Sequence, residues 1–307
     1  MKTLCIGLLF LVSGAVAGSD YEPVAEPVAD GVYAIVGPTT GRTYENHGLN
    51  NNLGFVVTAE GVVLIDSGAS LQGAALVERA VRAVTDRPVR WVINTGGQDH
   101  RWLGNGYFRE RGAEIIALAS TVATQRRYGT QQLDALKPVL KDRLEGTVPV
   151  YADAPLDGLV AELNLGGEPV VVRYLGDAHY PGDATVWLPT KNVVFTGDLV
   201  YVDRMLGVLP WSDVRAWRQA FEEMKALQPA IIVPGHGRVC DLDRAQRDTG
   251  DYLDWLVTEV GAAVQSWEPL DEVVERLGDA PQFERLRHFE SWHRTNVNRT
   301  YLQLEGG

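Results

Sequence analysis

The chain has 307 residues, a formal net charge of −12 and a pI near 5.0. Nucleic-acid binding depends on clustered lysine and arginine, so this acidic balance argues against a nucleic-acid partner. The sequence has two cysteines, Cys5 and Cys240. If Cys5 leaves with an N-terminal signal, no intramolecular disulfide can form, and stability must come from the core.

The first 17 residues have the plan of a cleavable secretory signal, in which Lys2 precedes an apolar run and Ala15-Val16-Ala17 ends the segment. The run is shorter than the ~20 apolar residues that a membrane-spanning helix needs. This favours cleavage after Ala17 over a retained anchor. No later segment has the length and apolar character of a membrane span. We therefore expect a periplasmic or secreted mature protein without a span.

Residues 18–30 are rich in proline, alanine and acid and are predicted to be an extended lead-in to a folded domain at 31–307. Short apolar runs predict strands at 32–36, 54–58, 62–65, 89–93 and 114–117, and helical spacing predicts helices at 74–84 and 120–127. Residues 133–154 are polar and are predicted to form a helix and loop on the surface.

The second half of the domain has a similar arrangement. Strands are predicted at 160–163, 170–174, 184–188, 192–195 and 230–233, with a helix at 211–227 and further helices over 241–305. Two similar halves, each a β-meander with helices outside it, predict one domain of layered α/β architecture.

Short polar motifs stand where these strands are predicted to end. They are Asp66-Ser67-Gly68, residues 94–100, residues 176–179, Gly197-Asp198 and Gly235-His236-Gly237. Zinc takes imidazole nitrogen and carboxylate oxygen in a roughly tetrahedral shell, so histidine and aspartate at neighbouring loop tips are suitable ligands. Each motif alone is weak evidence, but their order and spacing together are specific.

In that order the motifs resemble the metallo-β-lactamase superfamily, from about Gly31 to the end of the chain. The strongest matches are 64–68, Asp99-His100, 178–183, 195–198 and 234–237. The resemblance implies an αββα four-layer sandwich with one or two metal ions, usually zinc, at its edge.

The resemblance also implies which residues bind metal. The superfamily motif H-x-H-x-D-H falls on residues 95–100, so Thr95 and Gly97 replace two histidines of the first metal site. Of that site only His179 remains. Glycine has no ligand atom and a threonine hydroxyl is a poor zinc ligand beside imidazole or carboxylate.

The second metal site is complete by the same comparison. Asp99, His100 and His236 match its ligands, and Asp198 matches the carboxylate that usually bridges the two ions. We therefore expect one zinc ion rather than two, bound at this second site.

These residues predict a metal-dependent hydrolase with a small-molecule substrate. Zinc with an open coordination position lowers the pKa of bound water from 15.7 to ~7, and the hydroxide then attacks an ester, thioester or lactone-like centre in preference to a β-lactam. Asp99 and His179 are the candidate catalytic residues, His179 as a proton shuttle or as a hydrogen-bond donor to the oxyanion. Asp66 is expected to orient the metal-binding loop through hydrogen bonds.

Two other functions stay open. The first is a non-catalytic binding protein that lost its working centre together with the two histidines. The second is an iron-dependent redox enzyme like the sulfur dioxygenases of the superfamily, which the missing first-site histidines disfavour. The sequence determines neither the substrate nor the oligomeric state.

Several residues near the motifs have two readings. Arg204 either makes a bidentate contact with an anionic substrate group or forms a surface ion pair with Asp203. Cys240 is expected to be a buried small residue rather than a ligand, and His47 to belong to a turn. Tyr201, Trp211 and Trp102 either line a pocket or fill the core.

Overall fold

The computed structural model describes residues 21–306. The predicted signal at 1–17 lies outside the described residues. Within 21–306, no helix has the length and apolar character needed to cross a membrane.

The first sheet has six strands in the order β1-β2-β3-β4-β5-β6. They are β1 (Ala25–Ala29), β2 (Val32–Ile35), β3 (Leu53–Val57), β4 (Val62–Ile65), β5 (Val89–Ile93) and β6 (Glu114–Ile116). The strands β1 to β4 pair antiparallel, and β4, β5 and β6 pair parallel. The sheet thus begins before Gly31, because the extended lead-in pairs with β2 as its edge strand. Proline is tolerated there since an edge strand leaves backbone N–H groups unpaired.

The second sheet has five strands in the order β11-β10-β9-β8-β7. They are β7 (Val160–Leu165), β8 (Glu168–Arg173), β9 (Thr185–Leu188), β10 (Val193–Phe195) and β11 (Ile231–Val233). The strands β7 to β10 pair antiparallel, and β10 and β11 pair parallel.

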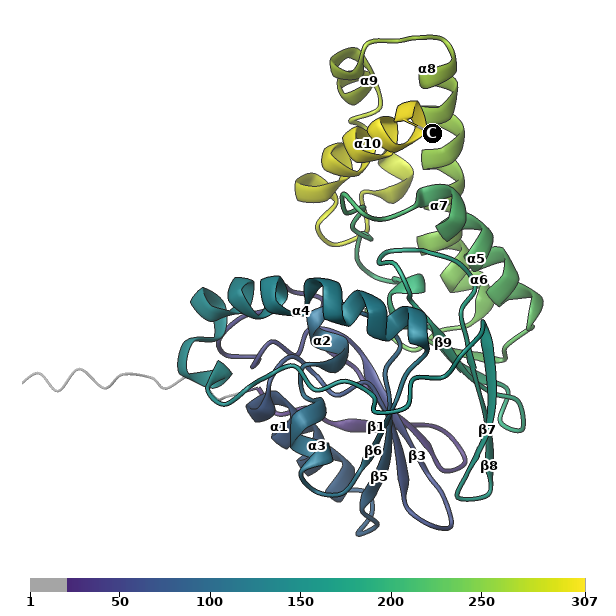
Figure 1. The fold of residues 1–307 in the computed structure, drawn as a ribbon. Coiled ribbons are helices and arrows are strands. Elements are labelled where there is room, and N and C mark those ends of the chain that lie inside the picture. Colours follow the sequence, from purple (N-terminus) through teal and green to yellow (C-terminus); the bar gives the residue numbers. More distant parts are fainter. Residues whose placement is uncertain (1–20, 307) are drawn as a thin grey trace, which may run out of the picture.

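Helices lie outside both sheets (Figure 1). The first half contains α1 (Leu71–Arg82), α2 (Asp99–Trp102), α3 (Asn105–Arg109) and α4 (Ala119–Leu140). The second contains α5 (Val214–Ala226), α6 (Leu242–Ala245), α7 (Asp251–Trp255), α8 (Gly261–Gln265), α9 (Leu270–Arg276) and α10 (Phe289–Gly306). Two π-helical turns, Gln246–Gly250 and Leu256–Val260, join α6, α7 and α8. Helix α4 is one continuous element of 22 residues, where the sequence predicts a short helix at 120–127 and a separate helix and loop over 133–154.

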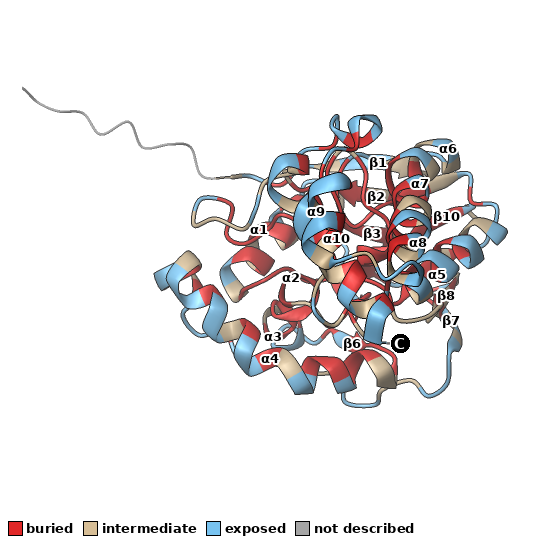
Figure 2. Ribbon diagram, turned by 90° about the horizontal axis from the view of Figure 1, so that it is seen from above, coloured by how far each residue is buried: buried red, intermediate tan, exposed pale blue. Residues whose placement is uncertain are grey.

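The two sheets face each other across an apolar core. Val56, Val63 and Ile93 of the first sheet belong to the same buried cluster as Val172 and Val186 of the second. Figure 2 shows the strands buried at the centre, with exposed residues on the outer helices. The predicted αββα sandwich is therefore confirmed.

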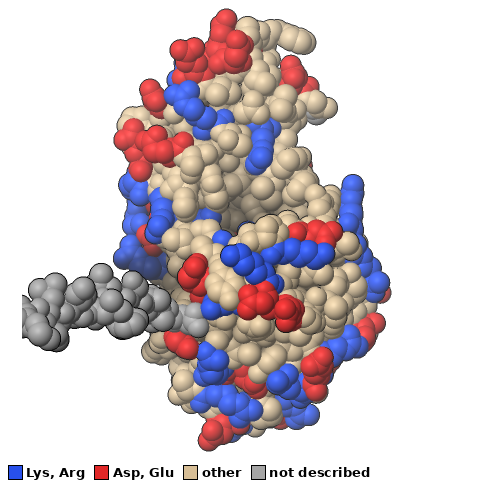
Figure 3. Space-filling view, turned by 90° about the vertical axis from the view of Figure 1, so that its left-hand side faces the viewer, with Lys and Arg blue, Asp and Glu red and all other residues tan. Residues whose placement is uncertain are grey.

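The topology brings the motifs to one edge of the sandwich. Parallel strands place their carboxyl ends at the same edge, and β4, β5, β10 and β11 end directly before Asp66, Asn94, Thr196 and Pro234. Acidic and basic side chains are interspersed on the face shown in Figure 3, which is hollowed between the C-terminal helices and the rest of the molecule.

Candidate metal centre

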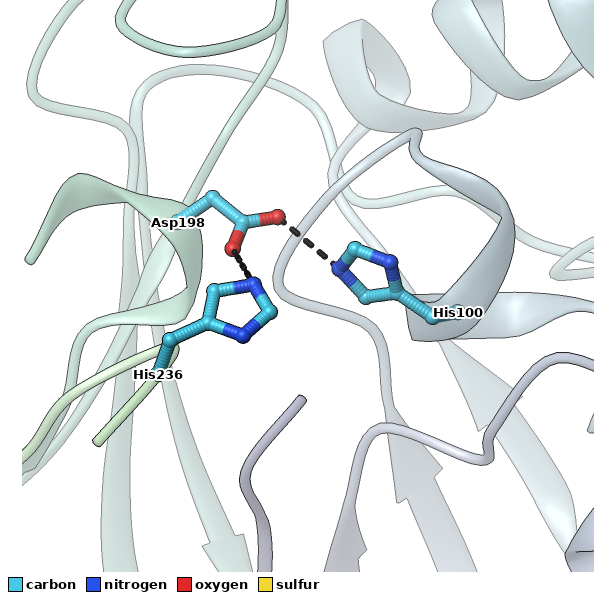
Figure 4. A group of neighbouring side chains, drawn as sticks. All are labelled: His100, Asp198 and His236. Carbon is cyan, nitrogen blue, oxygen red and sulfur yellow. Dashed lines mark hydrogen bonds and ion pairs between the residues drawn. The ribbon is translucent and has the colours of Figure 1, made fainter. Parts of the chain in front are cut away.

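Three of the predicted ligands meet at this edge. The ligand atoms of His100, Asp198 and His236 all lie within 4.8 Å of one another, and all three residues are buried. His100 Nε2 lies 3.1 Å from Asp198 Oδ2, and His236 Nε2 lies 3.2 Å from Asp198 Oδ1 (Figure 4). The two imidazoles therefore converge on one carboxylate from opposite halves of the fold.

The donor set fits a metal ion, as the hydrogen bonds of His236 indicate. Its Nδ1 lies 2.8 Å from the carbonyl oxygen of Asn50, which can only accept, so Nδ1 carries the proton. Burial, and then the charge of Arg204, hold the pKa of His236 well below its usual value, so the ring is neutral. Its Nε2 lone pair therefore faces a carboxylate oxygen of Asp198. This nitrogen and this oxygen are both acceptors, so a cation between them would satisfy both. Histidines that bind a metal commonly donate their other N–H to a carbonyl in the same way.

The second imidazole is held by a different partner. Arg42 Nη2 lies 2.5 Å from His100 Nδ1 and 2.5 Å from Asp99 Oδ1. A guanidinium always donates, so Nδ1 of His100 accepts and its Nε2 carries the proton toward Asp198. Coordination through Nε2 therefore requires that Arg42 leave His100 and that the proton move to Nδ1.

Asp99 points to this arginine rather than into the three-residue cluster. Its Oδ1 also accepts from the backbone N–H of His100 at 2.7 Å. Burial alone would raise the pKa of Asp99, but the charge of Arg42 and the contacts with His100 outweigh it and lower the pKa to about 2. Asp99 is thus an ionised carboxylate beside the cluster.

Arg101 is a buried cation at the centre of the site. Its Nη1 donates to Asp66 Oδ2 at 2.9 Å and its Nη2 donates to Asp198 Oδ1 at 2.6 Å. It also donates to the carbonyl oxygens of Asn52 and Gly235 at 3.0 and 3.3 Å. Burial alone would raise the pKa of Asp198, but Arg101 and His100 together hold it well below the usual range. Asp198 is therefore ionised and fixed in position.

The residues that replace the two first-site histidines have structural contacts of their own. Thr95 is fully buried, and its backbone N–H and hydroxyl donate to Asp66 at 2.8 and 2.7 Å. A Cβ at Gly97 would lie 2.5 Å from Cγ2 and 2.9 Å from Cβ of Thr124. The space that a histidine side chain at Gly97 would need is therefore taken by α4.

Gln98 contacts the remaining histidine of the first site. The Nδ1 of His179 donates to the carbonyl oxygen of Gly207 at 2.7 Å, so its Nε2 accepts. The hydrogen-bond network orients the Gln98 amide with its nitrogen toward His179 Nε2 at 3.1 Å and Asp198 Oδ2 at 3.2 Å, and its oxygen toward Arg42. The amide thus lies between the two residues that would share a first ion. Burial lowers the pKa of His179 to about 4.

A pocket of about 330 Å³ opens beside the cluster. His100, His179 and His236 line it together with Tyr201 and Gln98. Helix α10 contributes a further part of the wall with Trp292, Thr295, Asn296 and Arg299. The site thus has both a candidate metal position and room for a small molecule.

The sequence singled out the five polar residues of the site but not the arginines that hold them. Asp99 and His179 lie beside the three-residue cluster, with Arg42 and Gln98 as their respective partners. Arg101 could have been predicted from the pattern of charges. Buried carboxylates at the ends of neighbouring strands need a cation close by, and Arg101 directly follows the motif at 94–100. No comparable signal distinguishes Arg42.

Two layered sheets with helices outside and a His-Asp-His cluster at the strand ends define a class of metal-binding α/β protein. The sequence profile of the metallo-beta-lactamase superfamily matches residues 48–236, and the chain belongs to this superfamily. This confirms the predicted family and, at the level of the family, a metal-dependent hydrolase.

Known relatives agree with this membership. The chain is 26% identical to a type 2 metallo-beta-lactamase of Bacteroides fragilis over 198 residues, which are 59% of this chain and 70% of the relative. It is 25% identical to a metallo-beta-lactamase of Chryseobacterium indologenes over 210 residues, 67% of this chain and 77% of the relative.

Solved structures have the same fold. A metallo-beta-lactamase from Pontibacter korlensis superposes with a TM-score of 0.62 at 19% identity, covering 76% of this chain and 99% of the other. The stereoselective inverting sec-alkylsulfatase Pisa1 from a Pseudomonas species superposes with a TM-score of 0.73 at 14% identity, covering 92% of this chain and 50% of the other.

Proposed function

We propose that the protein is a hydrolase that holds a single zinc ion at His100, Asp198 and His236 and cleaves an ester, thioester or lactone-like bond in a small molecule. The observation that carries this proposal is the convergence of His100, Asp198 and His236, whose ligand atoms all lie within 4.8 Å of one another. When bound, zinc supplies a Lewis acid that lowers the pKa of a bound water from 15.7 to ~7.

The proposal of one ion rests on the filled first site. The Gln98 amide lies between His179 and Asp198, and Thr124 takes the space next to Gly97. Arg101 supplies a fixed positive charge against Asp198. These groups leave the His-Asp-His cluster as the position for an ion.

The side chains around the cluster then have distinct roles. Asp198 orients both imidazoles, and Arg101 keeps its carboxylate in place. Because His179 donates from Nδ1 to Gly207, its Nε2 can accept a proton but cannot donate one to an oxyanion. We therefore assign His179 the role of proton acceptor. In this assignment, a bound substrate takes the place of Gln98 at Nε2 of His179. Asp99 would supply a further carboxylate ligand if Arg42 were displaced from it.

The test is elemental analysis of the purified protein together with His236→Ala and, as a matched control, His293→Ala. His293 is also buried, but it lies outside the cluster. We expect about one zinc per chain in the wild type and in His293→Ala, and none in His236→Ala. Asp99→Ala should bind zinc more weakly, since it removes only the fourth ligand.

A non-catalytic binding protein is the second candidate, because Arg42 occupies Nδ1 of His100 at 2.5 Å and thereby opposes metal binding. Wild-type protein without zinc after dialysis against zinc would support this candidate and contradict the hydrolase. Zinc-loaded protein should hydrolyse members of an ester, thioester and lactone panel, and His236→Ala should not.

We also propose export, with cleavage after Ala17, on the basis of the signal-like residues 1–17. The mass of the protein recovered from a periplasmic or secreted fraction tests this. A mass that includes residues 1–17 would contradict it.

A further inference from the structure

Arg204 is a buried guanidinium without an acidic partner among the described residues. The residue is 3% exposed, and its Nε has no hydrogen-bond partner within 21–306. Its Nη1 lies 3.5 Å from the carbonyl oxygen of Thr40 and 3.2 Å from His236 Nδ1. The second contact is not a hydrogen bond, because that nitrogen already donates to Asn50. No carboxylate of the described residues therefore contacts this charge directly, although Asp198 lies near enough to attract it.

The neighbouring carboxylate is not available to Arg204. Asp203 is bound by Arg238 and Arg244, at 2.9 and 2.6 Å, and has a left-handed backbone with φ of 62°. The surface ion pair between Arg204 and Asp203 that the sequence left open is therefore absent from the described structure.

Arg204 instead lines the pocket beside the cluster, and its surroundings are positive. The pocket-lining residues include Arg42 and Arg299 but no aspartate or glutamate. Arg42 also has a buried Nε without a partner among the described residues. The ring of Trp292 lies 4.8 Å from Cζ of Arg204 and supports the guanidinium from one side.

An uncompensated buried charge is costly, and a guanidinium in this state is satisfied best by a planar oxyanion that accepts two of its N–H groups. We propose that Arg204 binds an anionic group of the substrate, a carboxylate or a similar oxyanion, while the bond to be cleaved lies at the His-Asp-His cluster. This inference rests on the proposed function and narrows its substrate class to anionic esters or thioesters. Arg42, once displaced from His100, would lie on the same side of the pocket.

Arg204 lies inside residues 48–236, the segment that matches the family, but several of its neighbours in the pocket do not. Arg42 precedes residues 48–236, and Trp292 and Arg299 follow them on α10. The pocket wall around Arg204 thus combines residues from inside and outside the matched segment.

The test measures binding separately from hydrolysis. Glutarate, a small dicarboxylate, and sulfate are titrated calorimetrically into zinc-treated wild type, Arg204→Gln and Arg276→Gln. Arg276 matches the change in charge, but it pairs with Glu268 on the exposed surface. We expect binding at least tenfold weaker in Arg204→Gln, a loss of about 1.4 kcal/mol, and unchanged binding in Arg276→Gln. Equal affinity in both variants, or no binding of either anion by the wild type, would overturn the inference.

Thermal unfolding distinguishes a binding role from a structural one. Without added anion, Arg204→Gln should melt no lower than the wild type, because the substitution removes a buried charge that lacks a partner. Glutarate should raise the melting temperature of the wild type but not that of the variant. A variant that melts several degrees lower without any anion would assign Arg204 a structural role and overturn the inference.

Hydrolysis separates this inference from the proposed function. The wild type should cleave 4-nitrophenyl hemiglutarate faster than 4-nitrophenyl valerate, which has similar length but no carboxylate, and Arg204→Gln should lose most of this preference. Arg204-dependent glutarate binding without cleavage of either ester would support the anion site while contradicting the hydrolase. Cleavage of both esters with the same preference in wild type and variant would leave the hydrolase standing and overturn the anion site.

Discussion

Arg101 connects two carboxylates that come from different sheets. Asp66 follows β4 and Asp198 follows β10, and both side chains are ion-paired with the same buried guanidinium. Removing one partner of a buried ion pair leaves an uncompensated charge, which is more costly than the loss of an exposed pair. The stability of the metal-binding edge therefore depends on this residue.

We expect Arg101→Met to lower the free energy of unfolding by ~3–5 kcal/mol, measured by urea denaturation. Arg109→Gln is the matched control, because Arg109 pairs with Asp153 on the exposed surface. It should change the free energy by less than ~1 kcal/mol. Similar losses in both variants would mean that Arg101 does not hold the two carboxylates.

Gly97 has no space beside it for a larger side chain. Gly97→His should not restore the first metal site, because its Cβ would lie 2.5 Å from Thr124 Cγ2. Overpacking of this kind costs ~1–3 kcal/mol of stability. The variant should bind no more metal than the wild type in elemental analysis, and the double variant with Thr124→Gly should recover part of the lost stability. A second zinc ion in Gly97→His would contradict the argument.

The candidate ligands could be identified from the sequence because their residue types and spacing match the family motif. The residues that contact these ligands, Arg42 and Gln98, could not be identified in this way. Arg42 reaches His100 from a loop more than fifty positions earlier, and nothing local in the sequence marks such a contact. The role of Gln98 also depends on where His179 and Asp198 meet, which only the fold determines.

Helices and strands differed in how well their sequence patterns predicted them. The buried strands are short apolar runs and were predicted at nearly their observed positions. Helix α4 was not predicted as one element because its buried face includes Gln125, Gly129 and Gln132 as well as apolar residues. Gly129 lies against the ring of Trp102, where a Cβ would be 2.9 Å from Cη2. A face of this composition gives no apolar periodicity.

Helix α10 contains a buried histidine that makes folding dependent on pH. His293 contacts the hydroxyl of Tyr252 and the carbonyl oxygen of Leu277, and burial lowers its pKa from the usual 6.5. Between this lowered pKa and about pH 6.5, the unfolded state therefore binds more protons than the folded state. The stabilising contribution is present above that pH and is lost as the pH falls through the lowered pKa.

In urea titrations with a chelator present, the free energy of unfolding should fall between pH 7.5 and 5. His293→Gln should flatten this slope by up to ~1.4 kcal/mol per pH unit, the value for one proton. The glutamine amide can still donate to the carbonyl oxygen of Leu277. The two proteins therefore differ mainly in whether residue 293 can take up a proton. Equal slopes in wild type and variant would show that His293 does not contribute.

At the scale of the whole molecule, the candidate ligands join the two halves of the sandwich. His100 belongs to the first half, and Asp198 and His236 belong to the second. An ion that binds only the folded state stabilises it by ~2.7 kcal/mol at a hundredfold excess over its dissociation constant. Zinc should therefore slow exchange in both halves at once.

Hydrogen exchange followed by mass spectrometry tests this with peptides that cover 94–104 and 196–206. We expect zinc to protect both peptides in the wild type and neither in His236→Ala. Protection confined to one half would contradict an ion shared between the sheets. The layered architecture itself was predictable, because two strand-rich halves with outer helices have few ways to bury their apolar faces.

The position of the pocket wall has a consequence for the order in which the site is made. Residues 48–236 carry the ligands, whereas Trp292 and Arg299 lie on α10, which a ribosome synthesises later. A nascent chain that has reached only Gly237 contains every candidate ligand and Arg204, but it lacks the part of the pocket lining that α10 contributes. The pocket is thus complete only once α10 has been made, and the same helix also supplies Phe289, Val297 and Tyr301 to the buried core.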